Sequence, residues 1–220
     1  MPNHRKEEKT RPKDNEHCFR GLGRQFWRDK ALGFRPSIVN GRDGYHIEYD
    51  TESKVLGPDV PNADDFAYQN GGIARPDETA MRPGTYLRFC DSRRKYWVGN
   101  WWLDYDHFSL IRAWAIERDL SLAAAAHRCL VIPTEWGDCG RLVKAGLNRR
   151  LRAYVGKGKP ATATVSPHNA QRTASQPVVL SPAELEIKQW FVPGEPALLS
   201  RFFGLEGSLD AFRETGFPRS

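Results

Sequence analysis

The sequence lacks the features that mark several large classes of protein. It has no apolar run approaching the roughly 18 residues of a membrane-spanning helix. Residues 1–16 are charged and contain no apolar segment of the kind found in a secretory signal peptide. The four cysteines are widely and irregularly spaced, which favours free thiols in a reducing compartment. We therefore expect a cytoplasmic protein with no membrane partner, although export by a leaderless secretion system remains compatible with these features.

Common catalytic and nucleotide-binding motifs are also missing. The chain contains no Gly-x-Gly-x-x-Gly, no Gly-x-x-x-x-Gly-Lys-Ser/Thr, no Gly-x-Ser-x-Gly and no His-Glu-x-x-His. His127 and Cys129, with Cys139 ten residues further on, are ligand types, but their spacing matches no standard zinc pattern. We expect no metal site.

Acidic residues are absent from one long stretch, residues 139–183. The bases of this stretch are Arg141, Lys144, Arg149, Arg150, Arg152, Lys157, Lys159 and Arg172. Residues 43–65, by contrast, contain seven acids and one base, Lys54. The acid-free stretch predicts a basic surface that could bind nucleic acid or an acidic protein target, or else a merely solvated face.

Composition and hydrophobic periodicity divide the chain into three parts. Residues 1–17 are charged and aperiodic, which is typical of a disordered tail. Residues 18–83 would hold a short helix over 19–34, a β-hairpin over 37–49 around a Gly-rich turn, and a Pro-rich linker. Residues 84–220 would form one α+β domain, with a single mixed or antiparallel sheet, a few short helices and a flexible loop over 156–176.

Within this domain the elements alternate between strands and helices. We expect Asp104 or Asp106 to cap a helix that ends near Arg118, and Ser121 to cap another over 122–130. Residues 141–156 alternate apolar and polar, which predicts one half-buried strand or two strands bent at 148–149. Further strands are expected at 85–90, 96–103, 178–180 and 185–192, and short C-terminal helices at 197–203 and 209–215.

Three groups of residues could carry chemistry. Glu184 and Glu186, at the head of an expected strand, would point the same way about 7 Å apart, so that one could stabilise a cation while the other orients a nucleophile. The alternative is two solvated acids on an edge strand.

Arg88 is the second candidate, because it interrupts an apolar strand. A buried arginine needs a partner, which could be a ligand phosphate or an acid of this protein.

The third candidate is the aromatic group Tyr96, Trp97, Trp101 and Trp102, with Trp97 and Trp101 expected on one face of a strand and Trp102 on the other. This group is either ordinary sheet core or a platform for a flat ring, since stacking on a base contributes roughly 1–3 kcal/mol.

Taken in chain order, these residues resemble the mono-ADP-ribosyltransferase fold of bacterial toxins. The resemblance implies that Arg88 holds NAD, with Tyr96, Trp97 and Trp101 beside it, and that Glu186 stabilises the transition state while Glu184 orients the acceptor. The family's Ser-Thr-Ser on the second strand is absent, and Tyr96-Trp97 stand near its place.

Three hypotheses follow. The chain is an NAD-using transferase or glycohydrolase, a nucleic-acid-binding accessory protein of a phage, plasmid or other mobile element, or a non-enzymatic interaction domain. They differ in one geometric expectation, because only the first requires Arg88 and Glu186 to converge on one pocket.

Overall fold

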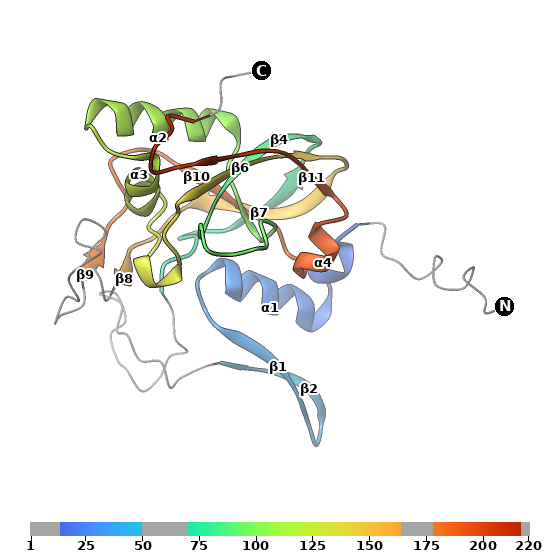
Figure 1. Ribbon diagram of the computed structural model, residues 1–220. Coiled ribbons are helices and arrows are strands. Elements are labelled where there is room, and N and C mark those ends of the chain that lie inside the picture. Colours follow the sequence, from blue (N-terminus) through green and yellow to red (C-terminus); the bar gives the residue numbers. More distant parts are fainter. Residues whose placement is uncertain (1–13, 50–69, 164–177, 217–220) are drawn as a thin grey trace.

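Two antiparallel sheets pack face to face, and helices cover their outer faces (Figure 1). The computed structural model describes residues 14–49, 70–163 and 178–216. The expected mixed α+β fold is confirmed, with its strands divided among several small sheets.

The helices of the described residues are α1 (Gly21–Ala31), α2 (Tyr105–Glu117), α3 (Leu122–Cys129) and α4 (Pro196–Leu199), with 3-10 turns η2 (Glu16–Phe19) and η3 (Thr134–Trp136). The strands are β1 (Pro36–Gly41), β2 (Gly44–Tyr49), β3 (Asp77–Met81), β4 (Gly84–Cys90), β5 (Trp101–Trp102), β6 (Arg141–Leu147), β7 (Leu151–Lys157), β8 (Ala161–Ala163), β9 (Val178–Leu180), β10 (Lys188–Phe191) and β11 (Phe203–Asp210).

The larger sheet has the order β3-β7-β10-β5, and the smaller one has the order β11-β6-β4. Two further pairs, β1-β2 and β8-β9, are hairpin-like ribbons. Leu87 in β4 and Leu103 after β5 exchange backbone hydrogen bonds of 2.8 Å, which joins the two larger sheets. The bend expected at 148–149 separates β6 from β7, so that each strand belongs to a different sheet.

The core between the sheets follows from the alternation of the strands. Val143 and Ala145 of β6 and Leu151 and Ala153 of β7 point into one buried cluster, because alternate residues of a strand lie on the same face of its sheet. Trp102 stacks on Phe203 in this cluster, with ring centroids 4.1 Å apart and an interplanar angle of 5°.

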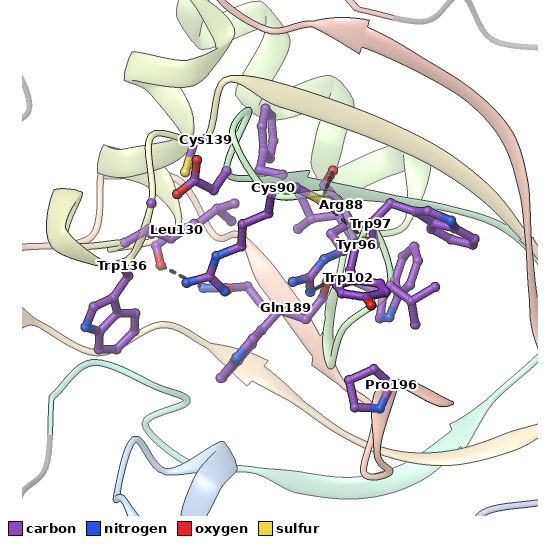
Figure 2. A pocket seen from close by; sticks show the side chains of 18 of the residues that line it. Arg88, Cys90, Tyr96, Trp97, Trp102, Leu130, Trp136, Cys139, Gln189 and Pro196 are labelled. Carbon is purple, nitrogen blue, oxygen red and sulfur yellow. Dashed lines mark hydrogen bonds between the residues drawn. The ribbon is translucent and has the colours of Figure 1, made fainter. Parts of the chain in front are cut away.

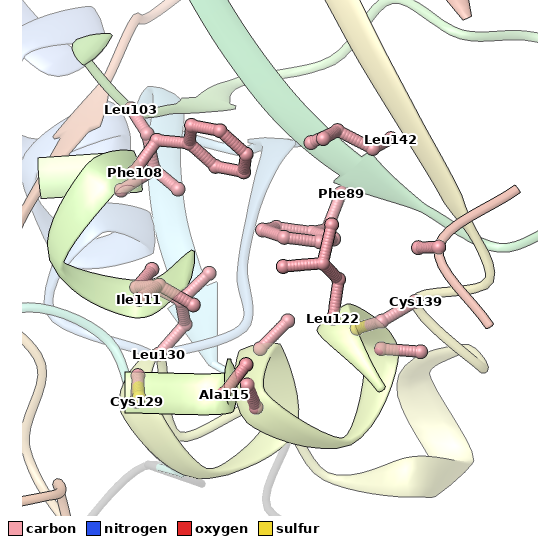
Figure 3. Packing of buried hydrophobic residues seen from close by; sticks show 14 of the residues in the cluster. Phe89, Leu103, Phe108, Ile111, Ala115, Leu122, Cys129, Leu130, Cys139 and Leu142 are labelled. Atoms are coloured by element: carbon pink, nitrogen blue, oxygen red, sulfur yellow. The ribbon is translucent and has the colours of Figure 1, made fainter. Parts of the chain in front are cut away.

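Helices α2 and α3 cover the outer face of the smaller sheet. Phe89 and Leu142 of the sheet meet Phe108, Ile111 and Leu122 of the helices (Figure 3). Both helices begin where the sequence predicts, because Asp104 accepts from the backbone N–H of His107 and Ser121 accepts from that of Ala124.

Helix α1 covers the outer face of the larger sheet. Its Trp27 and Ala31 pack against Tyr154 and Phe191 of that sheet. The helix ends at Ala31, and Gly33, just beyond the C-cap Leu32, has φ +92° and lies so close to the backbone of residues 70–71 that a Cβ would overlap it. The hairpin β1–β2, expected from the sequence, projects from this side of the molecule (Figure 1).

The end of the expected tail is built into the fold. Asn15 is fully buried, and its side chain donates to the carbonyls of Arg152 and Pro193 at 2.8 and 2.9 Å. It also accepts from the N–H of Arg152 at 3.0 Å. Residues 14–17 are therefore attached to β7, while residues 1–13 of the expected tail lie outside the described residues.

Other expected boundaries also shift. Strand β3 lies inside the expected Pro-rich linker and pairs with β7 of the main domain; the rest of that linker up to residue 69 lies outside the described residues. The expected flexible loop begins as the end of β7 and continues as β8, and its residues 164–176 are likewise not described.

Two expected elements are wrong. Residues 203–210 form β11 rather than the end of one C-terminal helix and the start of another, because they pair with β6 along its whole length. The strand expected over 96–103 is reduced to Trp101–Trp102, since residues 96–100 form a loop.

Among the helices of the described ranges, none has the length and apolar character needed to cross a membrane.

Candidate functional site

A pocket of about 850 Å³ lies beside Arg88, within the range of roughly 300–1,000 Å³ typical of small-molecule sites. Its walls come from β4, the loop after it, β5, the segment after α3, β10 and the start of α4 (Figure 2). The residues predicted to bind a cofactor all line it: Arg88, Tyr96, Trp97 and Trp101.

Arg88 is half-buried and has no carboxylate partner among the residues that the structure describes. Its Nη1 donates to the carbonyl of Trp101 at 3.0 Å, and its Nε is buried without any hydrogen-bond partner. Leaving a buried charged donor unsatisfied is costly, so the protein satisfies the guanidinium of Arg88 only in part.

The loop opposite Arg88 is held close to it. Gly99 lies so near that an added Cβ would stand 2.5 Å from Cζ of Arg88. Trp102 Nε1 donates to the Gly99 carbonyl at 2.8 Å, and the Asn100 side chain donates to the carbonyls of Val192 and Gly194 at 2.8 and 2.9 Å. These bonds fix the loop, so the guanidinium rests on a rigid backbone.

The aromatic residues divide between pocket and core. Trp97 packs edge-on against Trp102 with centroids 6.4 Å apart, whereas Trp101 packs edge-on against Phe191 at 4.9 Å, under α1. The expectation that Trp97 shares a face with Trp101 is therefore wrong. The loop at 96–100 breaks the period of two and places Trp97 with Trp102. Tyr96 is 80% exposed at the rim.

A second arginine, Arg94, lines the pocket and is exposed. Arg141 donates from Nη2 to the carbonyls of Arg94 and Tyr96 at 2.8 and 3.3 Å, which ties this rim to the end of β6. Asp91 also lines the pocket, but the hydrogen bond from Arg93 holds the pKa of its carboxyl below the usual value and occupies it.

The Glu-x-Glu pair does not share this pocket. Glu184 and Glu186 are exposed and lie in a bend before β10, not at the head of a strand. The N–H of Ile187 bonds the carbonyl of Leu185 at 2.9 Å, so the chain turns tightly at Glu186 and its side chain pairs with Lys157. Neither carboxylate lines the pocket with Arg88, so that geometric expectation is not met in the described residues.

Sequence reasoning missed Gln189, the residue that β10 presents to the pocket instead (Figure 2). Its side chain is 7% exposed, and its Nε2 donates to the Leu130 carbonyl at 3.2 Å. A glutamine between two exposed or half-exposed residues gives no sequence signal, since only the direction in which the strand faces makes it part of a site.

The pocket wall contains two unusual backbone conformations. Val131 and Cys139 have φ values of 53° and 52°. A β-branched residue at positive φ is a genuine outlier, and such strain is concentrated at ligand sites. Cys139 is not a ready nucleophile there, because burial raises the pKa of its thiol.

The fold gives several described bases of the acid-free stretch a partner. Acids from elsewhere in the chain meet three of its bases: Lys144 pairs with Glu206, Arg152 with Glu16 and Glu78, and Lys157 with Glu186. Arg149 lies over the ring of Phe202 and Lys159 over that of Phe34, at 5.7 and 5.9 Å from the centroids. Arg172 lies outside the described residues.

Within the part of the chain that is described, no group of three or more His, Cys, Asp or Glu could hold a metal ion. The chain matches no protein-family model, and neither curated proteins nor solved structures give a match.

Proposed function

We propose that this protein binds a nucleotide-like anion in the pocket beside Arg88, with NAD as the first candidate. The observation that carries the proposal is the half-buried Arg88, which lines the pocket, makes one side-chain hydrogen bond and has no carboxylate partner among the described residues. A phosphate can accept from a guanidinium, and in this pocket it would accept from Nη2 of Arg88, which makes no hydrogen bond among the described residues and, unlike Nε, is not buried.

The surroundings of Arg88 support a ligand that has both a ring and phosphates. Trp97, Trp101 and Trp136 offer flat apolar surfaces in the walls, on which a ring could stack. Arg94 at the rim supplies a second cation, so that a diphosphate could span from Arg88 inside to Arg94 outside.

Isothermal titration with NAD, ADP-ribose and AMP tests this proposal. We expect all three to bind the wild-type chain, and Arg88→Met to weaken binding by roughly 10- to 100-fold, because a hydrogen bond to a charged group is worth about 1.5–3 kcal/mol. Arg150→Met is the matched control, since Arg150 is exposed and does not line the pocket.

A wild-type protein that binds none of the three compounds would contradict the proposal. So would equal loss of affinity in the two arginine variants, because that would assign the effect to net charge rather than to the pocket.

The transferase is the more specific form of the proposal, and it needs a carboxylate near the reacting carbon. Glu186, the candidate from the resemblance, is 75% exposed in its side chain and pairs with Lys157. The carboxylates that line the pocket are Asp91 and Glu195. NAD turnover should therefore be compared in Glu186→Gln, Glu195→Gln and Asp91→Asn: unchanged turnover in an active Glu186→Gln protein would remove Glu186 from the mechanism.

A further inference from the structure

We infer that Gln189 makes this pocket select a carboxamide over a carboxylate, so that it distinguishes NAD from its nicotinic acid counterpart. The inference rests on the proposed function and names the part of the ligand that lies against β10.

Gln189 is a buried amide with few partners. It is 7% exposed, and its one side-chain hydrogen bond among the described residues is the bond of 3.2 Å from Nε2 to the Leu130 carbonyl. A glutamine amide can make up to four hydrogen bonds, two as donor and two as acceptor. Buried polar groups are normally satisfied, so a bound molecule that completes these bonds would be favoured.

The orientation of the amide is set by its surroundings. A carbonyl oxygen can only accept, so the nitrogen of Gln189 must face Leu130. Gly158 stands on the same side, where an added Cβ would come 3.0 Å from Nε2. The oxygen Oε1 is thus left as an acceptor, and a ligand group beside it should be a donor.

Gln189 and Arg88 line the same pocket from strands that are connected through β5. Arg88 bonds the carbonyl of Trp101, and Trp101 pairs with Phe191 across β5 and β10. Gln189 is two residues from Phe191 on the same strand, which is about 7 Å along an extended chain. In the proposed complex the ribose would lie between a phosphate on Arg88 and a ring beside Gln189, since both residues line the same pocket.

A carboxamide and a carboxylate differ in this position in one respect. The carboxamide can donate to Oε1 and also accept from the second N–H of Nε2, whereas the ionised carboxylate presents only acceptors and leaves Oε1 without a donor. We expect the wild-type protein to bind NAD roughly tenfold to a hundredfold more tightly than nicotinic acid adenine dinucleotide.

Titration calorimetry with these two dinucleotides tests the inference in three proteins: wild type, Gln189→Met and Lys188→Met. Methionine keeps the length of glutamine and removes its hydrogen bonds, so Gln189→Met should bind both dinucleotides within about twofold of each other. Lys188 is the exposed neighbour on the same strand, and Lys188→Met should keep the wild-type preference. Thermal unfolding verifies that each variant is folded. If Gln189→Met does not fold, Gln189→Asn, which keeps the amide on a shorter side chain, serves as the second variant.

The outcomes separate the two proposals. Equal affinity of the wild type for both dinucleotides, with loss of both in Arg88→Met, would overturn the role of Gln189 and leave the pocket proposal intact. A preference that persists in Gln189→Met would do the same. Failure of the wild type to bind either dinucleotide would overturn both.

Discussion

Arg88 and Arg152 are both strand arginines, and they meet opposite surroundings. Arg152 lies in β7 between Glu16 and Glu78, with its guanidinium 4.5 Å from the centroid of Phe19. Arg88 lies in β4 beside a pocket, with no carboxylate partner among the described residues and with its Nε unsatisfied.

The difference shows that local charge in a sequence is a poor guide to local charge on a surface. Arg152 belongs to an acid-free stretch, yet its acids come from residues 136 and 74 positions earlier in the chain. Arg88, by contrast, has Asp91 three residues away, but that carboxylate is taken by Arg93. Folding therefore gives Arg152 two acidic partners from distant parts of the chain. It leaves Arg88 without a carboxylate partner among the described residues, although Asp91 is close in sequence.

The largest expected effect comes from displacing Arg88 without changing it. In Gly99→Ala the new Cβ would overlap the guanidinium. The end of a flexible side chain can move, so the fold should persist while the arginine leaves its position. We expect NAD affinity to fall by about 100-fold, equivalent to about 2.7 kcal/mol, in a titration.

Gly204→Ala is the control for that substitution, because the nearest atom to its added Cβ is 4.0 Å away. Unchanged affinity in a folded Gly99→Ala protein would show that the position of Arg88 does not determine binding.

The next largest effect concerns the segment that brings Glu16 to Arg152. Asn15→Ala removes three buried hydrogen bonds to the backbone of Arg152 and Pro193 and leaves those groups without partners. We expect the free energy of unfolding in urea to fall by about 2–3 kcal/mol. A loss below about 0.5 kcal/mol would mean that the segment is not attached in solution.

The smallest expected effects are the losses of unfolding free energy when either of two bases of the acid-free stretch is replaced. Arg152→Met should cost about 1 kcal/mol, because its guanidinium meets two carboxylates and an aromatic ring. Lys157→Met should cost less than about 0.5 kcal/mol, since its one partner, Glu186, is 75% exposed. Urea unfolding of both variants measures the difference. A larger loss in Lys157→Met than in Arg152→Met would contradict the argument that the better-partnered base contributes more.

Local patterns predicted much of the fold. The period of two over β6 and β7, the caps of α2 and α3, and the hairpin β1–β2 all depend on residues close in sequence, and all are confirmed. Strand β11 was missed because Gly204 and Gly207 and a bulge between Leu205 and Gly207 hide its alternation. Its identity as a strand comes from pairing with β6, which no local pattern reveals.

Only the part of the candidate site that stands out in the local sequence was predicted. Arg88 was found because a charge within an apolar strand stands out in the sequence. Gln189 could not be found, because its burial depends on contacts with residues far along the chain, such as Leu130. The interest in Glu186 arose from a short pattern whose geometry assumed a strand, and the turn before β10 removes that assumption.

The burial of Asn15 has a consequence for the order of folding. Its two carbonyl partners lie 137 and 178 residues further along the chain, so during synthesis the complete set of bonds can form only after Pro193 has left the ribosome. Contacts between distant residues slow folding because the loop between them must close first. The beginning of the domain should therefore be among the last parts to acquire protection against amide hydrogen exchange during refolding.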